Sequence, residues 1–270
     1  MDKYERLKDI LHSLGSVAVA FSAGVDSTLL LYGAHEALKD KAVAVTVASP
    51  LIPKEELEQA EEYCRSLGVR QMILEADVLG IEGFSENPAD RCYICKKHIF
   101  RMIKEKAAGE GILYVAEGSN TDDDKDYRPG RRAIEELGIK SPLKEAGLGK
   151  SGIRELSEKL GLPTWDKPSL ACLASRIPYG DEITEKKLEM IGEAEGYLKG
   201  LGFRQLRVRL HGDMARIELE PSEITALMDE DIRTAVNRHF REKGFSYVSL
   251  DLEGYRTGSM NKNVTDPQGQ

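Results

Sequence analysis

The chain has 270 residues, of which 41% are hydrophobic and 31% charged, and its formal net charge at pH 7 is −8. This length suffices for one large domain or two smaller ones with a substantial core. The acidic charge argues against a broad surface for nucleic acid or membrane, although it leaves room for a local basic pocket. No apolar run approaches the roughly 20 residues of a membrane span, and the first ten residues are unlike a signal peptide. We therefore expect a cytoplasmic protein, whose four cysteines are metal ligands, reactive thiols or core residues rather than a disulfide scaffold.

The first strong motif is VAVAFSAGVDST, residues 17–28. Its first five residues form an apolar, β-branched run that is typical of a strand buried on both faces. A loop of small residues follows, and a helix pattern begins near Thr28. This geometry directs unpaired backbone N–H groups and a helix dipole at an anion, and Asp26 suits it if that carboxylate holds Mg²⁺ against a phosphate. We predict a nucleotide site formed by Ser22, Gly24, Val25, Asp26 and Ser27.

The first half of the chain continues with alternating strand and helix patterns. Further strands are predicted at 42–48, 69–74, 112–116 and 162–165, and helices at 54–67, 91–108, 131–137 and 153–160. Ser151 is the expected cap of the last helix. Repeated βα units predict an α/β fold, namely a doubly wound parallel sheet that binds ligands at the carboxyl ends of its strands.

One glycine-rich stretch is rejected as a phosphate loop. Residues 147–152, GLGKSG, match a dinucleotide-binding pattern, but no apolar strand precedes them. They also resemble the end of a Walker A loop, yet Lys144 stands where that loop needs its first glycine. We therefore assign this stretch no nucleotide contact.

Beyond Pro178 the pattern changes. A helix is predicted at 183–201, strands at 205–210 and 214–219, a helix at 222–243 and a last strand at 245–252. This order is typical of a small α+β domain. We predict a doubly wound domain over residues 1–178, a smaller α+β domain over 179–256 and a polar tail over 257–270.

The predicted hairpin carries charge. If Gly212 and Asp213 form its turn, Arg209 faces Arg216 and Arg207 faces Glu218 on one face of the sheet. That face is either a solvated polar surface or, because opposed like charges cost stability, the place of an anion such as a substrate phosphate.

The cysteines give the next signal. Cys64 falls on the apolar face of its helix and is expected in the core. Cys92 and Cys95 lie one turn apart at the start of a helix, and Cys172 follows the last predicted strand. Loops after parallel strands meet at one edge of the sheet, so these three thiols can converge. They suit an iron–sulfur cluster with one open iron, a Cys₃His zinc site completed by His98, or a redox-active pair with Cys172 uninvolved.

Several motifs together resemble known families. Residues 22–27 resemble the SGGxDS signature of the PP-loop ATP pyrophosphatases, with Ala23 where another glycine is usual beside Gly24; an alanine there is expected to keep φ negative. Together with residues 22–27, the segments 87–100, 117–123, 160–180 and 202–218 are similar to the LarE family of ATP-dependent sulfur transferases. The likeness extends to about Met260.

The resemblance implies a hexamer with an N-terminal PP-loop domain and a smaller C-terminal domain. Members adenylate a carboxylate of pyridinium-3,5-biscarboxylic acid mononucleotide, release pyrophosphate and form a thiocarboxylate for the nickel-pincer nucleotide cofactor of lactate racemase. Cys172 matches the sulfur-donor position. Cys92 and Cys95 imply the branch in which three cysteines hold a [4Fe–4S] cluster that delivers the sulfur.

The resemblance also implies site residues and the cofactors ATP and Mg²⁺. Gly118, in the loop 117–120, is expected to line the nucleotide, and Asp122 and Asp123 are either ligands or solvated loop residues. The implied substrate contacts are Lys96, Arg176, Glu195, Arg207, Arg209, Glu218 and Arg256, although a plain surface role is the alternative for Lys96. Two other functions stay open: a PP-loop iron–sulfur tRNA thiolase, which needs a broad basic face, and a non-catalytic, nucleotide-binding redox sensor.

Overall fold

The computed structural model describes residues 2–125, 129–169 and 171–256, so the predicted polar tail from 257 lies outside the described residues. The chain forms two compact units. The first unit comprises Met1–Ile81 and Asp90–Leu170, and the second comprises Glu82–Ala89 and Ala171–Gln270. The short stretch 82–89 therefore belongs to the second unit although it lies between two halves of the first.

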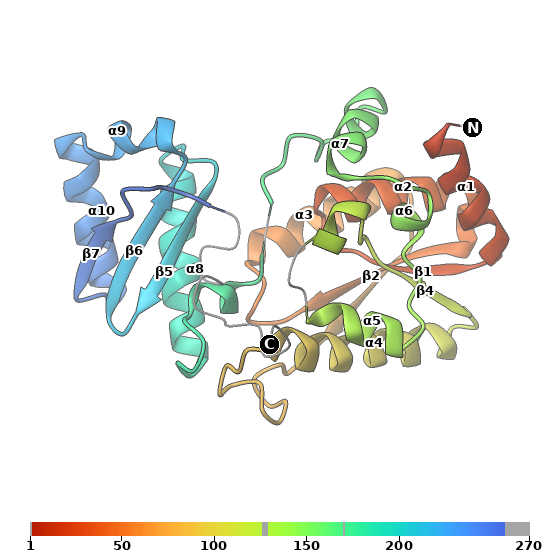
Figure 1. The fold of residues 1–270 in the computed structure, drawn as a ribbon, viewed down its shortest axis with the longest axis horizontal. Coiled ribbons are helices and arrows are strands. Elements are labelled where there is room, and N and C mark those ends of the chain that lie inside the picture. Colours follow the sequence, from red (N-terminus) through yellow and green to blue (C-terminus); the bar gives the residue numbers. More distant parts are fainter. Residues whose placement is uncertain (1, 126–128, 170, 257–270) are drawn as a thin grey trace. The chain divides into compact units, whose positions relative to one another are not determined.

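The first unit contains a parallel sheet with the strand order β3-β2-β1-β4 (Figure 1). Its strands are β1 (Val17–Ala20), β2 (Ala42–Ala48), β3 (Gln71–Glu75) and β4 (Tyr114–Ala116). Its helices are α1 (Lys3–Leu14), α2 (Val25–Leu38), α3 (Lys54–Leu67), α4 (Arg91–Gly109), α5 (Gly130–Glu136), α6 (Pro142–Glu145) and α7 (Lys150–Lys159). The predicted α/β class is confirmed.

The direction of the crossovers explains how the helices are distributed. The chain runs from β1 to β2 to β3 and then back past β1 to β4, and crossovers between parallel strands of one sheet are right-handed as a rule. Helices α2 and α3 consequently cover one face of the sheet and α4 covers the other (Figure 1). The core lies between these layers, where Leu29, Leu30 and Leu31 of α2 have no exposed surface.

Two local predictions in the first unit are wrong. Residues 162–165 form turns rather than a strand, because Pro163 has no N–H for a ladder and Arg154 takes the carbonyl oxygens of Trp165 and Lys167 at 2.6 and 2.7 Å. Ser151 does not cap α7, because the N-cap residue is Gly149 and the helix begins at Lys150.

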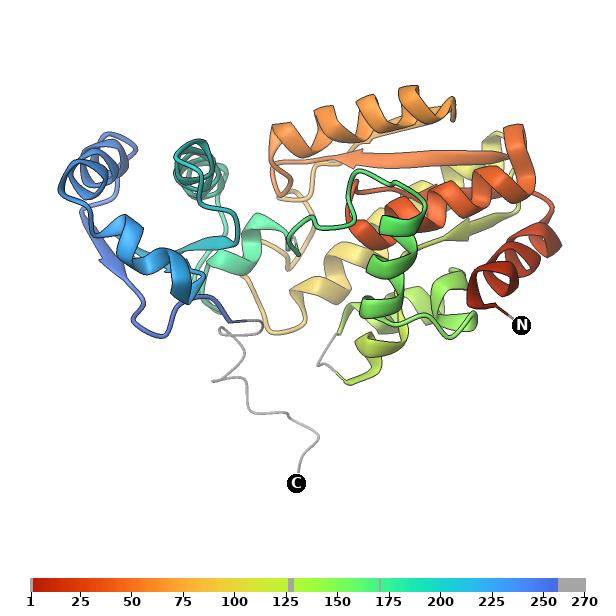
Figure 2. The ribbon, with the colours of Figure 1, turned by 90° about the horizontal axis from the view of Figure 1, so that it is seen from above.

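The second unit contains a sheet with the strand order β5-β6-β7, formed by β5 (Leu206–His211), β6 (Met214–Leu219) and β7 (Tyr247–Leu250). Helices α8 (Glu185–Gly200) and α10 (Glu230–Glu242) lie on one face of it (Figure 2). The predicted hairpin is confirmed, with Arg209 opposite Arg216 and Arg207 opposite Glu218. The single helix expected at 222–243 is wrong: α9 (Ile224–Leu227) ends early, and the Asp229 side chain caps α10 by accepting from the N–H groups of Asp231 and Ile232.

Short 3-10 turns complete the described elements, at Lys39–Lys41, Thr121–Lys125, Leu173–Arg176 and Pro221–Glu223. Among the described residues, no helix has both the length and the apolar character that crossing a bilayer requires.

Candidate active site

The loop after β1 leads directly into the start of α2. The N-cap residue, Gly24, has extended backbone angles, and no side chain caps the helix. The first-turn N–H groups of a helix need partners from outside it, and here they lie at the carboxyl end of a central strand. This combination is the usual place for a phosphate in an open α/β sheet.

Hydroxyl groups fix the shape of this loop. The Ser22 and Ser27 hydroxyl oxygens lie 3.2 Å apart. Ser27 also donates to the Gly24 carbonyl oxygen at 3.1 Å. The expectation that Ala23 keeps a negative φ is wrong: its φ is +51°, a left-handed conformation that costs an alanine about 1–2 kcal/mol. The glycine usual at this position in PP-loops avoids that cost.

Asp26 is only partly satisfied. Its Oδ2 accepts from the Lys150 Nζ at 2.5 Å, whereas its Oδ1 is buried without a hydrogen-bond partner. A buried carboxylate oxygen without a hydrogen-bond partner, next to a helix start that no side chain caps, is suited to bind Mg²⁺. Lys150 comes from the first residue of α7, within the glycine-rich stretch to which the sequence assigned no contact. The sequence feature that could have indicated this contact is a lysine placed directly after Gly149, at the first residue of a helix.

The loop after β4 lies against the loop after β1. A Cβ added to Gly118 would lie 3.2 Å from the Asp26 Cβ and 3.2 Å from the Ser27 backbone nitrogen. The two loops meet there because β1 and β4 are neighbours although the chain visits two other strands between them, which makes this edge the topological switch point. The structure therefore brings Gly118 to the loop that carries Asp26, and a side chain at Gly118 would be in tight contact with that loop.

Asp122 and Asp123 shape the loop after β4. The Asp122 Oδ2 accepts from the Lys150 backbone N–H at 2.8 Å, and the Asp123 Oδ2 accepts from the Asn120 N–H at 2.9 Å. Asp123 is buried, so it is no solvated loop residue. Asp122 thus holds the backbone at the start of α7, and Asp123 holds the backbone of the loop after β4.

A second lysine that the sequence did not single out also reaches the loop. The Lys167 Nζ donates to the Ala23 carbonyl oxygen at 3.0 Å, to Glu56 at 2.6 Å and to Gln59 at 2.7 Å. Lys167 thereby fixes the strained residue of the loop and ties it to the segment that leads toward Cys172.

No disulfide joins the four cysteines, all of which lie in the described part of the chain. Cys64 is buried in the core as predicted, and burial raises the pKa of its thiol to about 12. Cys92 and Cys95 are half-buried in the first turns of α4, in the first unit, whereas Cys172 is exposed and belongs to the second unit. Among the described residues, no three His, Cys, Asp or Glu side chains form a group that could hold a metal ion. The convergence of the three thiols stays a prediction.

Lys96 lies on α4 directly after Cys95, and its side chain contacts the start of α5. A Cβ added to Gly130 would approach the Lys96 Cδ to 2.6 Å, so the lysine stem is packed beneath the start of α5. Its ammonium group as a phosphate ligand stays a prediction.

In the second unit, Arg176 fixes the backbone around Cys172. Its guanidinium pairs with both Glu195 oxygens at 2.9 Å and donates to the Ala171 and Cys172 carbonyl oxygens at 2.6 and 3.0 Å. Burial disfavours ionisation of Glu195, but Arg176 outweighs that effect and holds the pKa of Glu195 below its usual range. Both residues thus have a positioning role in the described structure, and their contact with substrate stays a prediction.

The arginine face of the hairpin is formed by Arg207, Arg209, Arg216 and Glu218. Glu218 has no exposed surface and accepts from Arg209 at 2.8 Å and from Arg216 at 3.2 Å. Arg207 and Arg209 are each 5% exposed. A solvated polar surface is therefore the wrong interpretation of this face.

Arg207 lies over the Tyr255 ring, 5.0 Å from its centroid. Burial, with Arg176 nearby, lowers the pKa of Arg207 to about 10, so the guanidinium stays charged at neutral pH. Arg256 pairs with Asp251 at 3.4 Å, and Arg216 reaches the same carboxylate at 3.6 Å. Arg256 also pairs with Glu253, so five arginines, with Arg176 included, lie among the four carboxylates of Glu195, Glu218, Asp251 and Glu253. Such a concentration of guanidinium groups suits an anionic ligand.

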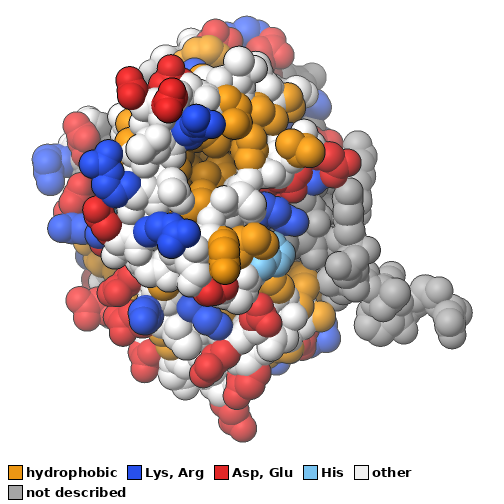
Figure 3. All heavy atoms as spheres, turned by 90° about the vertical axis from the view of Figure 1, so that its left-hand side faces the viewer, with side chains coloured by type: hydrophobic (Ala, Val, Ile, Leu, Met, Phe, Trp, Pro, Cys, Tyr) orange, Lys and Arg blue, Asp and Glu red, His pale blue; other side chains and the backbone are white. Residues whose placement is uncertain are grey.

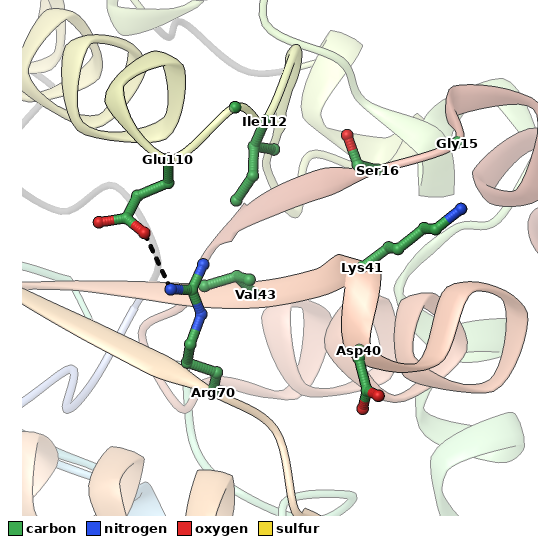
Figure 4. A pocket seen from close by; sticks show the side chains of 9 residues that line it. Gly15, Ser16, Asp40, Lys41, Val43, Arg70, Glu110 and Ile112 are labelled. Carbon is green, nitrogen blue, oxygen red and sulfur yellow. Dashed lines mark hydrogen bonds and ion pairs between the residues drawn. The ribbon is translucent and has the colours of Figure 1, made fainter.

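A pocket of about 410 Å³ lies elsewhere, at the opposite edge of the first sheet (Figure 4). Ser16, Lys41 and Arg70 line it, and each directly precedes a strand or lies at its amino end. Arg70 pairs with Glu110 across it at 2.9 Å. Ligands of doubly wound sheets bind at the carboxyl ends of the strands, so this pocket is not the candidate site.

Comparison with known proteins gives relatives that match nearly the whole chain, although no family model matches. The chain is 41% identical to an uncharacterized protein of Synechocystis over 97% of this chain and 98% of the relative. It is 39% identical to the pyridinium-3,5-bisthiocarboxylic acid mononucleotide synthase of Lactiplantibacillus plantarum, over 96% of this chain and 93% of that protein. A glutamine-hydrolysing GMP synthase of Limosilactobacillus reuteri is 30% identical over 68% of this chain and 39% of the relative.

Proposed function

This chain belongs to the family of pyridinium-3,5-bisthiocarboxylic acid mononucleotide synthases, the LarE family, and we propose that it is an ATP-dependent sulfur transferase acting on pyridinium-3,5-biscarboxylic acid mononucleotide. A substrate carboxylate oxygen attacks the α-phosphorus of ATP, and pyrophosphate leaves with the electrons of the broken P–O bond. The acyl adenylate is a good electrophile, because AMP is a better leaving group than oxide. A sulfur nucleophile then bonds to the acyl carbon and AMP departs, which leaves a thiocarboxylate.

The nucleotide half of the proposal depends chiefly on Asp26. One oxygen of this carboxylate pairs with Lys150 while the other is buried without a partner beside an uncapped helix start. We assign the first-turn N–H groups of α2 and the Lys150 ammonium to the phosphates of ATP, where both stabilise the charge of departing pyrophosphate. Mg²⁺ on Asp26 would add to this stabilisation.

The second half is recognition of an anionic substrate. Arg207 and Arg209 are buried cations on one sheet face, and Arg209 also donates to the Ser175 carbonyl oxygen at 2.9 Å. We assign the substrate phosphate to this arginine face, because bidentate guanidinium contacts suit a phosphate. The segment from Cys172 to Arg176 would then lie beside the bound substrate, which suits delivery of sulfur from a group held by Cys172.

The sulfur is proposed to be delivered through a [4Fe–4S] cluster on Cys92, Cys95 and Cys172. Three cysteines that are outside any disulfide, two of them one helical turn apart, form a donor set of the kind that ligates iron–sulfur clusters. Bound there, the cluster would carry the sulfide that becomes the nucleophile. Thiolate ligands of this kind need a reducing compartment, which favours the cytoplasm.

The family resemblance further suggests a hexamer that contributes to maturation of lactate racemase. Figure 3 shows apolar side chains gathered on one face among acidic and basic ones. In the second unit, large apolar side chains that stay exposed include Met228, Tyr247 and Leu252, which are 52%, 64% and 89% exposed. Surfaces of this kind suit burial between subunits.

Product analysis tests the proposed reaction. The protein is incubated with ATP, Mg²⁺, sulfide and the pyridinium dicarboxylate mononucleotide, and pyrophosphate and thiocarboxylate are measured. We expect both products from the unmodified chain, and from Cys172→Ala we expect pyrophosphate without thiocarboxylate. Sulfur added only to tRNA would favour a tRNA thiolase instead, and ATP binding without pyrophosphate release would favour a sensor.

Anaerobic reconstitution tests the cluster separately. We expect about four irons per chain, the number in a cubane cluster, and none in Cys92→Ala, Cys95→Ala or Cys172→Ala. Uptake of zinc without iron would exclude the cluster and leave the sulfur transferase reaction itself standing.

A further inference from the structure

Asn87 connects two stretches that are distant in the sequence. It belongs to the stretch Glu82–Ala89 of the second unit and has no exposed surface. Its side-chain amide donates to the Pro178 carbonyl oxygen at 2.7 Å and to the Asp181 carbonyl oxygen at 2.9 Å. The carbonyl oxygen of Ile177 lies 3.4 Å from the same nitrogen. The acceptors lie 90 to 94 residues further along the chain.

The backbone strengthens this junction. The Asn87 carbonyl oxygen accepts from the Gly180 N–H at 3.0 Å, and the Ser85 carbonyl oxygen accepts from the Ile183 N–H at 2.8 Å. We call these contacts, together with the Asn87 amide bonds, the Asn87 clasp. Asn87 has a φ of +57°, a conformation in which asparagine is enriched. The residue thus supplies both the turn and the buried donors.

Each side of the clasp leads to a cysteine. Asn87 precedes Cys92 by five residues, and Cys172 precedes Ile177 by five residues. Five residues span at most about 17 Å when fully extended. The clasp therefore limits how far either cysteine can lie from one common point, whatever path the intervening residues take.

We propose that Asn87 is a positioning residue that joins the segment leading into Cys92 and Cys95 to the segment following Cys172, and so holds the three thiols within mutual reach. The inference rests on the proposed function, because it gives the three thiols one shared task. The role is specific to Asn87: aspartate has the same shape but directs carboxylate oxygens at the carbonyl oxygens of Pro178 and Asp181.

Cross-linking of the full-length, metal-free chain tests the clasp. A short bismaleimide is added to the unmodified protein and to Asn87→Asp, and peptides that link Cys172 to Cys92 or Cys95 are quantified by mass spectrometry. Losing the junction lowers the effective concentration of one thiol near another, so we expect the linked yield to fall roughly tenfold in Asn87→Asp. Ile217→Val, a core change in β6, is the control for a general loss of stability and should keep the unmodified yield.

Hydrogen exchange gives an independent measurement of the same junction. The Gly180 and Ile183 amides should be protected in the unmodified protein and in Ile217→Val, and exposed in Asn87→Asp. Unchanged cross-linking in Asn87→Asp would overturn the inference and leave the proposed reaction intact. No cross-link in the unmodified protein, with both amides protected, would overturn the convergence of the thiols, and with it the inference and the proposed cluster.

Discussion

The loop after β1 and the arginine face of the hairpin differ in whether their charged groups have partners within the chain. The loop presents an uncapped helix start and a carboxylate with one buried oxygen that has no partner. The arginine face encloses Glu218 between Arg209 and Arg216; Glu218 and Arg209 are buried, and Arg216 is partly exposed. The loop after β1 therefore has polar groups without partners in the folded chain, whereas the charged groups of the arginine face are already paired with one another.

This difference predicts which property each region controls. Groups that lack partners in the folded chain contribute little to its stability and much to the binding of a ligand that completes them. Groups that are buried as ion pairs become costly as soon as one partner is removed, because the other charge stays buried. Substitutions in the loop should therefore affect catalysis first, and substitutions on the arginine face should affect stability first.

The largest expected effect is on the arginine face. Glu218→Ala leaves Arg209 and Arg216 without this buried carboxylate, and we expect a loss of about 3–5 kcal/mol in the free energy of unfolding, measured by urea titration. Glu155→Ala, which breaks an exposed pair with Lys159, is the control and should leave the urea midpoint unchanged. A Glu218→Ala protein of normal stability without activity would make Glu218 a substrate ligand rather than a part of the frame.

The next effect is in the loop. Asp26→Asn keeps the shape of the side chain but removes its charge, and we expect pyrophosphate release to fall by about 10²–10³-fold, as when one preorganised electrostatic contact is lost. The urea midpoint should stay within error of that of the unmodified protein. A large drop in stability with proportionate loss of activity would show that the Asp26–Lys150 pair belongs to the frame.

The third effect is the response of a second buried ion pair, Arg176–Glu195, to acid. Because the pKa of Glu195 is held below its usual range, its pairing with Arg176 stabilises the fold fully above the unfolded-state value of about 4.3. That contribution is lost as the pH falls through the lower, folded-state pKa. We expect Glu195→Gln to be less stable at neutral pH and to lose less stability between neutral pH and acid. Urea midpoints across this range measure it, and parallel curves for the two proteins would contradict the assignment.

The smallest expected effect relieves strain in the loop. Ala23→Gly removes the cost of a left-handed alanine but adds backbone freedom to the unfolded chain, and the balance should stabilise the protein by about 0.5 kcal/mol. Ala34→Gly, in the interior of α2, should instead destabilise it by about 1 kcal/mol or more. Calorimetric or urea unfolding distinguishes the two signs, and destabilisation by Ala23→Gly would contradict the strain.

Local patterns in the sequence are sufficient to predict the strands and the turn that carry the loop after β1 and the arginine face. The apolar runs at 17–21 and 42–48 became β1 and β2, and the Gly212–Asp213 turn fixed the register of the arginines. The contacts of Lys150 and Lys167 cannot be predicted from local patterns, because each lysine binds a loop more than 120 residues away in the sequence. The φ of Ala23 was misjudged because a bond from Lys167 and the packing of the loop outweigh the preference of alanine.

Residues 82–89 belong to the second unit but lie in sequence between the two segments of the first, and this order affects how the protein is made. On a ribosome that adds roughly 5–20 residues per second, the carbonyl groups of Ser85 and Asn87 emerge on the order of ten seconds before the N–H groups that they bind. During that interval these carbonyl groups lack the partners that they have in the folded chain. Neither unit is one continuous piece of chain, so cutting the gene at a single point cannot release either half as an intact module.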